Sequence, residues 1–274
     1  MSTSPVLMCL LANPVVVALT VCYGVAVAVF HVCAIRFGAK ATLISKSIAS
    51  LFFVIIGSVV LFPLLAPKDN AAVMGSGMYL LIFLGLMHGC IGDVLLACRK
   101  IFPQKRTKWI ALGMAAFALG HIYYAIAAFE YLNSTVNTLE TPLKMMLLIA
   151  PFVLSAAIDF GNIKLATRLN LAYGKLRIGV IIYSFIIAFL LFSTLVGSLT
   201  AFASTNDTIT LLPILPITLF TISDFVLSTN YFDKERRPMT PKQIIVIHVT
   251  YYMAQLMFAL ALSSPRLTCM ASSL

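Results

Sequence analysis

Long apolar runs are the feature of this chain that most constrains its fold. Several of them exceed the roughly 18 apolar residues that mark a candidate transmembrane helix. Hydropathy and the charges between the runs together predict eight spans joined by short connections. The predicted spans are Pro14–Ile35, Leu43–Leu65, Met78–Ala97, Trp109–Leu132, Leu143–Ile158, Ile178–Thr200, Leu211–Ser228 and Ile244–Ser263.

The runs are apolar throughout, and this excludes the other kind of structure that crosses membranes. Strands of a closed β-barrel alternate apolar and polar residues, which these runs do not. The chain is 61% hydrophobic and 10% charged, whereas a soluble domain is about a quarter charged. We therefore predict an all-α polytopic membrane bundle of about eight helices. The connections are too short for a second domain, so residues 1–274 are predicted to form a single integral membrane domain.

Most of the 19 Lys and Arg residues fall in alternate connections, and this asymmetry predicts the orientation. By the positive-inside rule these connections lie in the cytosol, and both termini lie on the other side of the membrane. The basic connections carry Arg36, Lys40 and Lys46; Arg99, Lys100, Lys105, Arg106 and Lys108; Lys164, Arg168, Lys175 and Arg177; and Lys234, Arg236, Arg237 and Lys242. The opposite face keeps only Lys68, Lys144 and Arg266.

The formal net charge of +10 is therefore largely a signal of topology. The basic rim also attracts anionic headgroups, so membrane lipids are expected partners. Nucleic-acid binding is excluded, because no soluble domain carries the charge. The expected membrane is the endoplasmic reticulum in a eukaryote or the inner membrane in a bacterium, with the site on the cytosolic side. A homodimer stays an open alternative.

Two aspartates lie well inside apolar runs, where an ionisable side chain is costly and is a functional candidate by default. Asp93 comes late in the third span and Asp224 comes late in the seventh, so the topology places both in the cytosolic third of the bilayer. Asp159 is placed at the cytosolic end of the fifth span. A structural carboxylate needs a nearby Lys or Arg, and the spans supply almost none. We therefore interpret Asp93 and Asp224 as functional groups, and expect them to face each other across a cavity.

Other polar side chains share helix faces near these carboxylates. The sixth span adds Tyr183, and Lys46 stands at the cytosolic start of the second span. The alternative interpretation is structural, because His and Tyr side chains also join helices by hydrogen bonds, and Lys46 can extend to the headgroups. The predicted faces are Thr221, Asp224, Ser228 and Tyr231; His248, Tyr251, Tyr252 and Gln255; and Phe117, His121 and Tyr124.

Four segments in the spans carry recognisable motifs. They are GCIGDVLLACRK (Gly89–Lys100), FALGHIYYAIAAF (Phe117–Phe129), LFTISDFVLSTNYF (Leu219–Phe232) and TYYMAQLMFAL (Thr250–Leu260). In their order and spacing they resemble the helix motifs of the YhhN family of lysoplasmalogenases, over the second to the eighth span. Two features depart from the family pattern. Lys46 is followed by Ser47 where the family often has Pro, and the segment Asp159–Lys175 matches no family motif.

The resemblance implies hydrolysis of the vinyl ether of a lysoplasmalogen, to a fatty aldehyde and glycerophosphoethanolamine or glycerophosphocholine. Acid cleaves vinyl ethers: a proton delivered to the β-carbon gives an oxocarbenium ion, to which water adds. This chemistry needs a protonated carboxyl group and a negative group beside the cation. Two carboxyl groups in an apolar site provide both. Asp93 and Asp224 are the predicted catalytic pair, with acid and base unassigned. No cofactor is required.

The remaining predicted site residues bind the lysophospholipid substrate. His121 and Tyr124 are expected to orient the ether oxygen or the water, and Lys46 with the basic rim is expected to hold the phosphate. Tyr252 and Gln255 are expected to hydrogen-bond a carboxyl group. The predicted substrate-binding set is Lys46, His121, Tyr124, Tyr183, Ser223, Asn230, Tyr252 and Gln255.

Three alternatives to this interpretation stay open. A zinc-dependent site would use His88, His121 or His248, which lie on separate spans without a signature spacing. A proton-coupled transporter of a small molecule or lipid also uses paired carboxylates inside the membrane. Against a transporter, the chain has no visible repeat and no pair of interrupted helices. The third alternative is a lipid sensor without catalysis.

Overall fold

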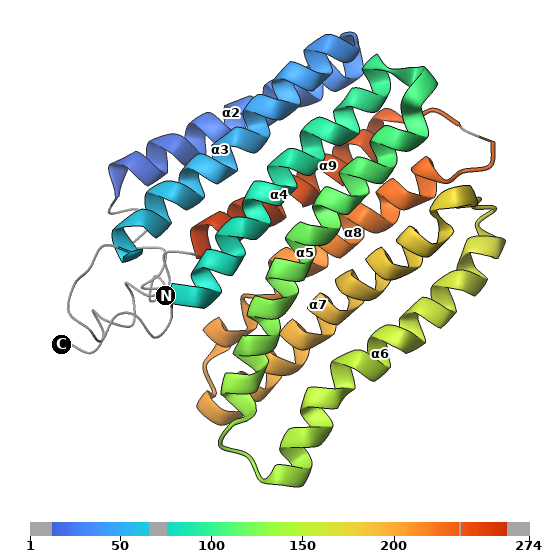
Figure 1. Cartoon of the computed structure of the whole chain (residues 1–274). Coiled ribbons are helices and arrows are strands. Elements are labelled where there is room, and N and C mark those ends of the chain that lie inside the picture. Colours follow the sequence, from blue (N-terminus) through green and yellow to red (C-terminus); the bar gives the residue numbers. More distant parts are fainter. Residues whose placement is uncertain (1–12, 66–75, 236, 262–274) are drawn as a thin grey trace. The chain divides into compact units, whose positions relative to one another are not determined.

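A computed structural model describes residues 13–65, 76–235 and 237–261 (Figure 1). Eight helices within these ranges are long and apolar enough to cross a bilayer, which confirms the predicted all-α, multi-pass membrane protein. Lys68, Arg236, Arg266 and the predicted end of the last span at Ser263 lie outside the described residues. The helices are α2 (Pro14–Arg36), α3 (Ala39–Leu65), α4 (Ser76–Ile101), α5 (Arg106–Val136), α6 (Thr141–Arg168), α7 (Arg177–Thr205), α8 (Ile214–Tyr231) and α9 (Pro241–Ala261).

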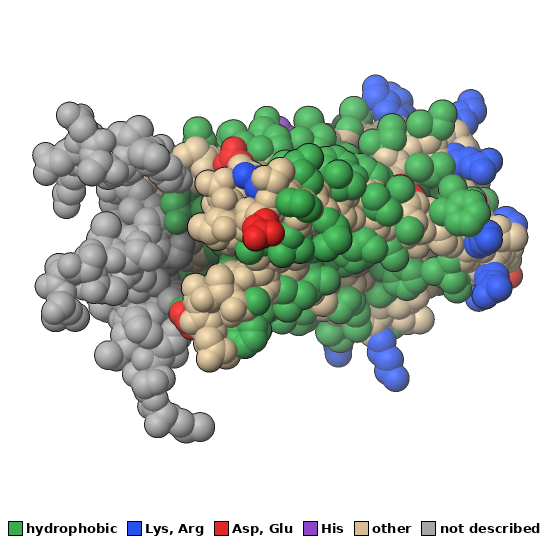
Figure 2. Space-filling model, turned by 90° about the horizontal axis from the view of Figure 1, so that it is seen from below, with side chains coloured by type: hydrophobic (Ala, Val, Ile, Leu, Met, Phe, Trp, Pro, Cys, Tyr) green, Lys and Arg blue, Asp and Glu red, His purple; other side chains and the backbone are tan. Residues whose placement is uncertain are grey.

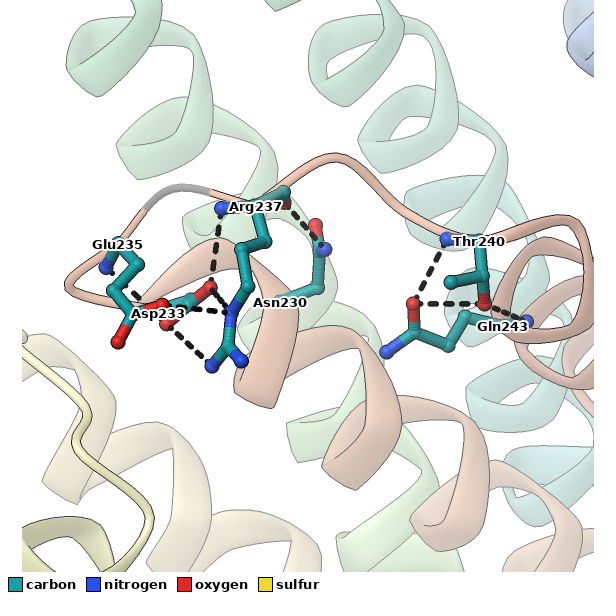
Figure 3. A network of polar contacts seen from close by, with 6 residues as sticks. All are labelled: Asn230, Asp233, Glu235, Arg237, Thr240 and Gln243. Atoms are coloured by element: carbon teal, nitrogen blue, oxygen red, sulfur yellow. Dashed lines mark hydrogen bonds and ion pairs between the residues drawn. The ribbon is translucent and has the colours of Figure 1, made fainter.

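Local sequence fixes where several helices begin and end. Asn13 caps α2, because its Oδ1 accepts hydrogen bonds from two amide groups of the first turn, and Pro14 stands where no amide donor is needed. α9 begins with a capping box, in which Thr240 Oγ1 accepts from Gln243 N at 3.2 Å and Gln243 Oε1 accepts from Thr240 N at 2.9 Å (Figure 3). α7 ends at Thr205 and is capped by Asn206, which adopts a left-handed φ of 54°.

The chain forms two compact units, and each is described by itself. In the first unit, whose described residues are 13–65, 76–113 and 255–261, α2 packs on α3 and α3 packs on α4. Ala49, Phe53 and Ile56 on α3 are fully buried in this unit. Gly113 allows a close approach to Leu96, because a Cβ at position 113 would lie 2.5 Å from Leu96 Cδ2. The antiparallel pairing brings the beginning of α3 beside the end of α4.

In the second unit, residues 114–254, α6 packs on α7 and α7 packs on α8. Three phenylalanine rings join α5, α6 and α7: Phe189 lies 4.5 Å from Phe152 and 5.7 Å from Phe129 between ring centroids. Gly197 on α7 permits close contact with α5, because a Cβ there would lie 3.2 Å from Leu132 Cα. Aromatic rings and one small residue therefore lie where α5, α6 and α7 meet in this unit.

The structure places Asp159 differently from the sequence interpretation. α6 continues to Arg168, past the predicted end of the fifth span at Ile158. Asp159 and Asn162 lower the hydropathy of this stretch, but they lie three residues apart on one helix face and do not interrupt the helix. Asp159 therefore lies inside a helix rather than at its end.

The α8–α9 connection in the second unit is organised around Asp233 (Figure 3). The carboxylate accepts hydrogen bonds from Arg237 N at 3.1 Å and from Arg237 Nε at 2.9 Å. The guanidinium hydrogen bonds lower the pKa of Asp233 from its ordinary value of 3.8 to about 2. An isolated antiparallel bridge pairs Asp233 with Leu171, so the α6–α7 and α8–α9 connections are joined.

Hydrophobic side chains cover the sides of the helices, while Lys and Arg side chains gather near helix ends (Figure 2). Val21, Ile44 and Ile178 are 63%, 60% and 73% exposed, which is costly in water and favourable against lipid. This surface fits the multi-pass membrane protein established above. The orientation and the host membrane stay predictions.

Candidate active site

The first unit contains a buried ion pair between Lys46 on α3 and Asp93 on α4. Lys46 Nζ lies 2.7 Å from Asp93 Oδ1, and Ser50 Oγ donates to Asp93 Oδ2 at 2.5 Å. Asp93 is 1% exposed and Lys46 is 8% exposed. Lys46 and Ser50 are four residues apart, so one face of α3 presents both donors to the same carboxylate.

This pair corrects one premise of the sequence interpretation. The spans were expected to supply almost no cationic partner for a buried carboxylate, and for Asp93 that expectation is wrong. Lys46 neither extends to the headgroups nor stands apart from the carboxylate, because it forms the ion pair. A salt bridge buried this deeply is costly to break, since either partner alone would be an uncompensated charge. The predicted role of Lys46 in holding phosphate stays a prediction.

The second unit contains the other predicted carboxyl group, Asp224 on α8. Tyr183 on α7 donates a hydrogen bond of 2.6 Å from its hydroxyl to Asp224 Oδ2. Asp93 belongs to the first unit and Asp224 to the second, and their expected pairing across a cavity stays a prediction. Within the second unit, Asp224 is thus a carboxyl group in an apolar helical environment with a short contact to a phenol.

His121 on α5 lies next to Asp224, and the orientation of its ring is fixed. Its Nδ1 lies 2.7 Å from Phe117 O, and because a carbonyl only accepts, Nδ1 carries the hydrogen. Nε2 faces Asp224 Oδ2 at 3.9 Å, which is longer than a hydrogen bond. The rings of Phe220 and Tyr183 pack edge-on against the imidazole at 4.5 and 5.4 Å. His121 therefore shapes the surroundings of Asp224.

A cavity of about 260 Å³ lies among α6, α7 and α8, and Asp224 is part of its wall. Thr221 and Ser228 line the same cavity, so three members of the polar face predicted for the seventh span share one cavity. Most of its other lining residues are apolar. Tyr183 also belongs to the wall, so the hydrogen-bonded pair Tyr183–Asp224 is accessible from the cavity. A cavity with an apolar lining and a few polar groups is the usual form of a small-molecule site.

Three other predicted substrate-binding residues, Tyr124, Ser223 and Asn230, make contacts within the second unit. Tyr124 is buried, with its ring 6.3 Å from that of His121. Ser223 donates to Ile247 O at 2.9 Å and so joins α8 to α9. Asn230 donates to the carbonyl of Arg237 at 3.3 Å, within the α8–α9 connection (Figure 3).

Two predicted residues of the last span are buried side chains. Tyr252 lies in the second unit, where its ring is 5.0 Å from that of Tyr251 and 6.4 Å from that of His248. Gln255 belongs to the first unit and is 1% exposed. The structure thus brings His121, Tyr124, Tyr183 and Asp224 together in the second unit, and Lys46 and Asp93 together in the first.

Sequence reasoning missed Ser50, Asn162 and Ser184. The spacing of Ser50 from Lys46 was a usable signal, since residues four apart share a helix face. Asn162 Nδ2 donates to Ser184 Oγ at 2.9 Å across α6 and α7, and both residues line the cavity that contains Asp224. That contact had no signal in the sequence, because hydropathy does not say which helix α6 packs against.

The histidines weighed as zinc ligands share one local geometry. The Nδ1 atoms of His88, His121 and His248 lie 2.9, 2.7 and 2.7 Å from the carbonyl oxygens four residues earlier in their helices. Among the residues that the structure describes, no three His, Cys, Asp or Glu side chains form a group suited to a metal ion.

The model of the YhhN family matches residues 50–262 of the chain. The matched range begins at Ser50 and includes Asp93, His121 and Asp224, whereas Lys46 precedes it. No curated protein and no solved structure matches the chain.

Proposed function

Since the chain belongs to the YhhN family, we propose that it is a lysoplasmalogenase, which hydrolyses the vinyl ether bond of a lysoplasmalogen with an ethanolamine or choline headgroup. The observation that most supports this function is the position of Asp224. This carboxyl group borders a largely apolar cavity and accepts a 2.6 Å hydrogen bond from Tyr183. A membrane-embedded cavity of this kind suits a lipid whose reactive bond lies between a polar headgroup and an alkenyl chain.

Asp224 is the proposed proton donor. In its protonated form it transfers a proton to the β-carbon of the vinyl ether, and the α-carbon becomes an oxocarbenium ion. The carboxylate left behind is the negative group beside this cation, as in the related reaction of glycosidases. The hydrogen bond from Tyr183 stabilises the carboxylate as it forms.

Water completes the reaction. It adds to the oxocarbenium carbon and returns a proton to the Asp224 carboxylate, which restores the acid. The hemiacetal then collapses: its hydroxyl proton passes to the ether oxygen, the bond between that oxygen and the carbon breaks, and the products are an aldehyde and an alcohol. General acid–base assistance of this kind contributes roughly 10²- to 10⁴-fold to a rate.

Asp93 stays the second proposed catalytic carboxyl group. Its ion pair with Lys46 and its hydrogen bond from Ser50 support a role as an anion rather than as the proton donor. His121, Tyr124 and Tyr183 are proposed to position the reacting groups around Asp224.

The test is release of fatty aldehyde by purified protein from ethanolamine and choline lysoplasmalogens. Wild type is expected to release aldehyde, and Asp224→Asn is expected to lose at least about 10²-fold in turnover. Glu130→Gln, which changes an exposed carboxylate of the second unit, is the matched control and keeps wild-type activity. Folded wild-type protein that releases no aldehyde from either headgroup across a range of pH would overturn the proposal.

A further inference from the structure

The cavity that contains Asp224 has a second carboxyl group in its wall. Asp159 on α6 lines this cavity and is 8% exposed. Asn162, one turn further along the helix, lines it as well. The cavity therefore has two acidic side chains on two helices, and of these two the reaction proposed above uses Asp224 and not Asp159.

Neutral polar groups lie near Asp159 in the wall of the cavity. Ser184 lines the same cavity, and its hydroxyl oxygen accepts from Asn162 Nδ2 at 2.9 Å. Asp93 and Asp233, by contrast, are paired with Lys46 and Arg237. Among the described residues, no Lys or Arg side chain forms an ion pair with Asp159. A nearly buried carboxylate without a protein cation is costly, and a cationic ligand would remove that cost.

Aromatic side chains complete the surroundings that an ammonium group needs. Two aromatic residues, Tyr173 and Phe225, line the cavity. Ammonium groups bind to a carboxylate by charge and hydrogen bonds, and to aromatic faces by cation–π attraction. The cavity thus offers both kinds of partner for an organic cation.

We propose that Asp159 binds the ammonium group of a lysophospholipid headgroup in this cavity and so makes the enzyme selective for headgroups that carry an ammonium group. This inference rests on the proposed function, because it takes the substrate to be a lysoplasmalogen. Tyr183 and Ser184 are consecutive residues of α7. Tyr183 hydrogen-bonds Asp224, and Ser184 accepts from Asn162, which lies on the same face of α6 as Asp159. One short segment of α7 therefore contacts both the reacting carboxyl group and the helix face that carries Asp159.

Binding without turnover tests the inference. The probes are a lysophosphoethanolamine with an alkyl ether, which has no vinyl ether to cleave, and its N-acetyl derivative, which has lost the positive charge. Wild type is expected to bind the ammonium form roughly 10- to 100-fold more tightly, as a charged hydrogen bond implies. Asp159→Asn is expected to lose this preference, Asp159→Glu to keep most of it, and Glu130→Gln to leave it unchanged.

Two results would overturn the inference. One is equal affinity of wild type for the two probes, which does not depend on the folding of any variant. The other is an unchanged preference in folded Asp159→Asn. Both are separate from failure of the proposed function, which is read from aldehyde release by wild type with the vinyl ether substrates.

Discussion

The hydroxyl of Tyr183 donates a 2.6 Å hydrogen bond to Asp224 Oδ2, and both side chains line one cavity of the second unit. The contact joins two helices, α7 and α8. It also sets the position of the carboxyl group that we propose as the proton donor. The contribution of this hydrogen bond to turnover can therefore be measured by removing the phenol hydroxyl.

Replacing Tyr183 by Phe removes the donor and keeps nearly the same volume. Turnover of lysoplasmalogen is expected to fall by about 10- to 100-fold, because the Asp224 carboxylate that forms on proton transfer loses a charge-assisted hydrogen bond. KM is expected to change little, since the interaction strengthens in the transition state. The measurement is the rate of aldehyde release against substrate concentration.

Tyr131→Phe is the control for this change, because Tyr131 lies in the same unit and does not line the cavity. It is expected to keep wild-type kinetics. Equal kinetics of wild type and Tyr183→Phe would show that the hydrogen bond only joins the two helices.

The Lys46–Asp93 ion pair makes a prediction about stability. Lys46→Met leaves Asp93 buried without its cation, and the free energy of unfolding is expected to fall by about 3–5 kcal/mol. The double variant Lys46→Met/Asp93→Asn is expected to recover most of this loss, because neither charge is then left alone. Unfolding in detergent, followed for the four members of the cycle, gives the coupling between the two residues.

Lys40→Met is the matched control, since Lys40 is exposed near the same end of α3. Its effect is expected to be within about 0.5 kcal/mol of zero. Losses in the two single variants that simply add in the double variant would argue against the ion pair.

The helices, and the position of Asp93 and Asp224 inside them, could be predicted from sequence, because hydropathy, charge asymmetry and isolated ionisable residues are properties of single segments. The partners of those aspartates could not. Lys46 and Asp93 are brought together by the packing of α3 on α4. Sequence periodicity shows which residues share a helix face, but it does not show which helix packs against that face. Asp159 was placed at a helix end for a related reason, since a polar helical stretch has the hydropathy of a loop.

Gly113 is expected to tolerate no side chain, because a Cβ there would lie 2.5 Å from Leu96 Cδ2 and 3.2 Å from Leu96 N. Gly113→Ala is expected to destabilise the protein by about 1–3 kcal/mol, as overpacking does. Gly24→Ala is the control within the same unit, since nothing lies within 4 Å of a Cβ at that position. It is expected to stabilise α2 by up to about 1 kcal/mol through helix propensity. The measurement is the thermal unfolding midpoint of each variant. Equal shifts for Gly113→Ala and Gly24→Ala would contradict the close contact between Gly113 and Leu96.

Asp233 makes the stability of the second unit depend on pH in the acidic range. Its pKa is about 2 in the folded protein because of the hydrogen bonds from Arg237, against an ordinary value of 3.8. The folded state therefore binds the proton less readily than the unfolded state. The stabilisation from this carboxylate is fully present above pH 3.8 and is lost as the pH falls toward 2.

We expect Asp233→Asn to reduce the change in the free energy of unfolding between pH 4 and pH 2. The same substitution is expected to lower the free energy of unfolding at neutral pH. Arg237→Gln is expected to act in the same direction, because it removes the donor that lowers the pKa. Unfolding midpoints measured in detergent from pH 6 to pH 2 check this, with Asp207→Asn as the control at an exposed aspartate that caps a short turn. An Asp233→Asn profile parallel to that of wild type over this range would show that the Asp233–Arg237 pair does not form in the folded protein.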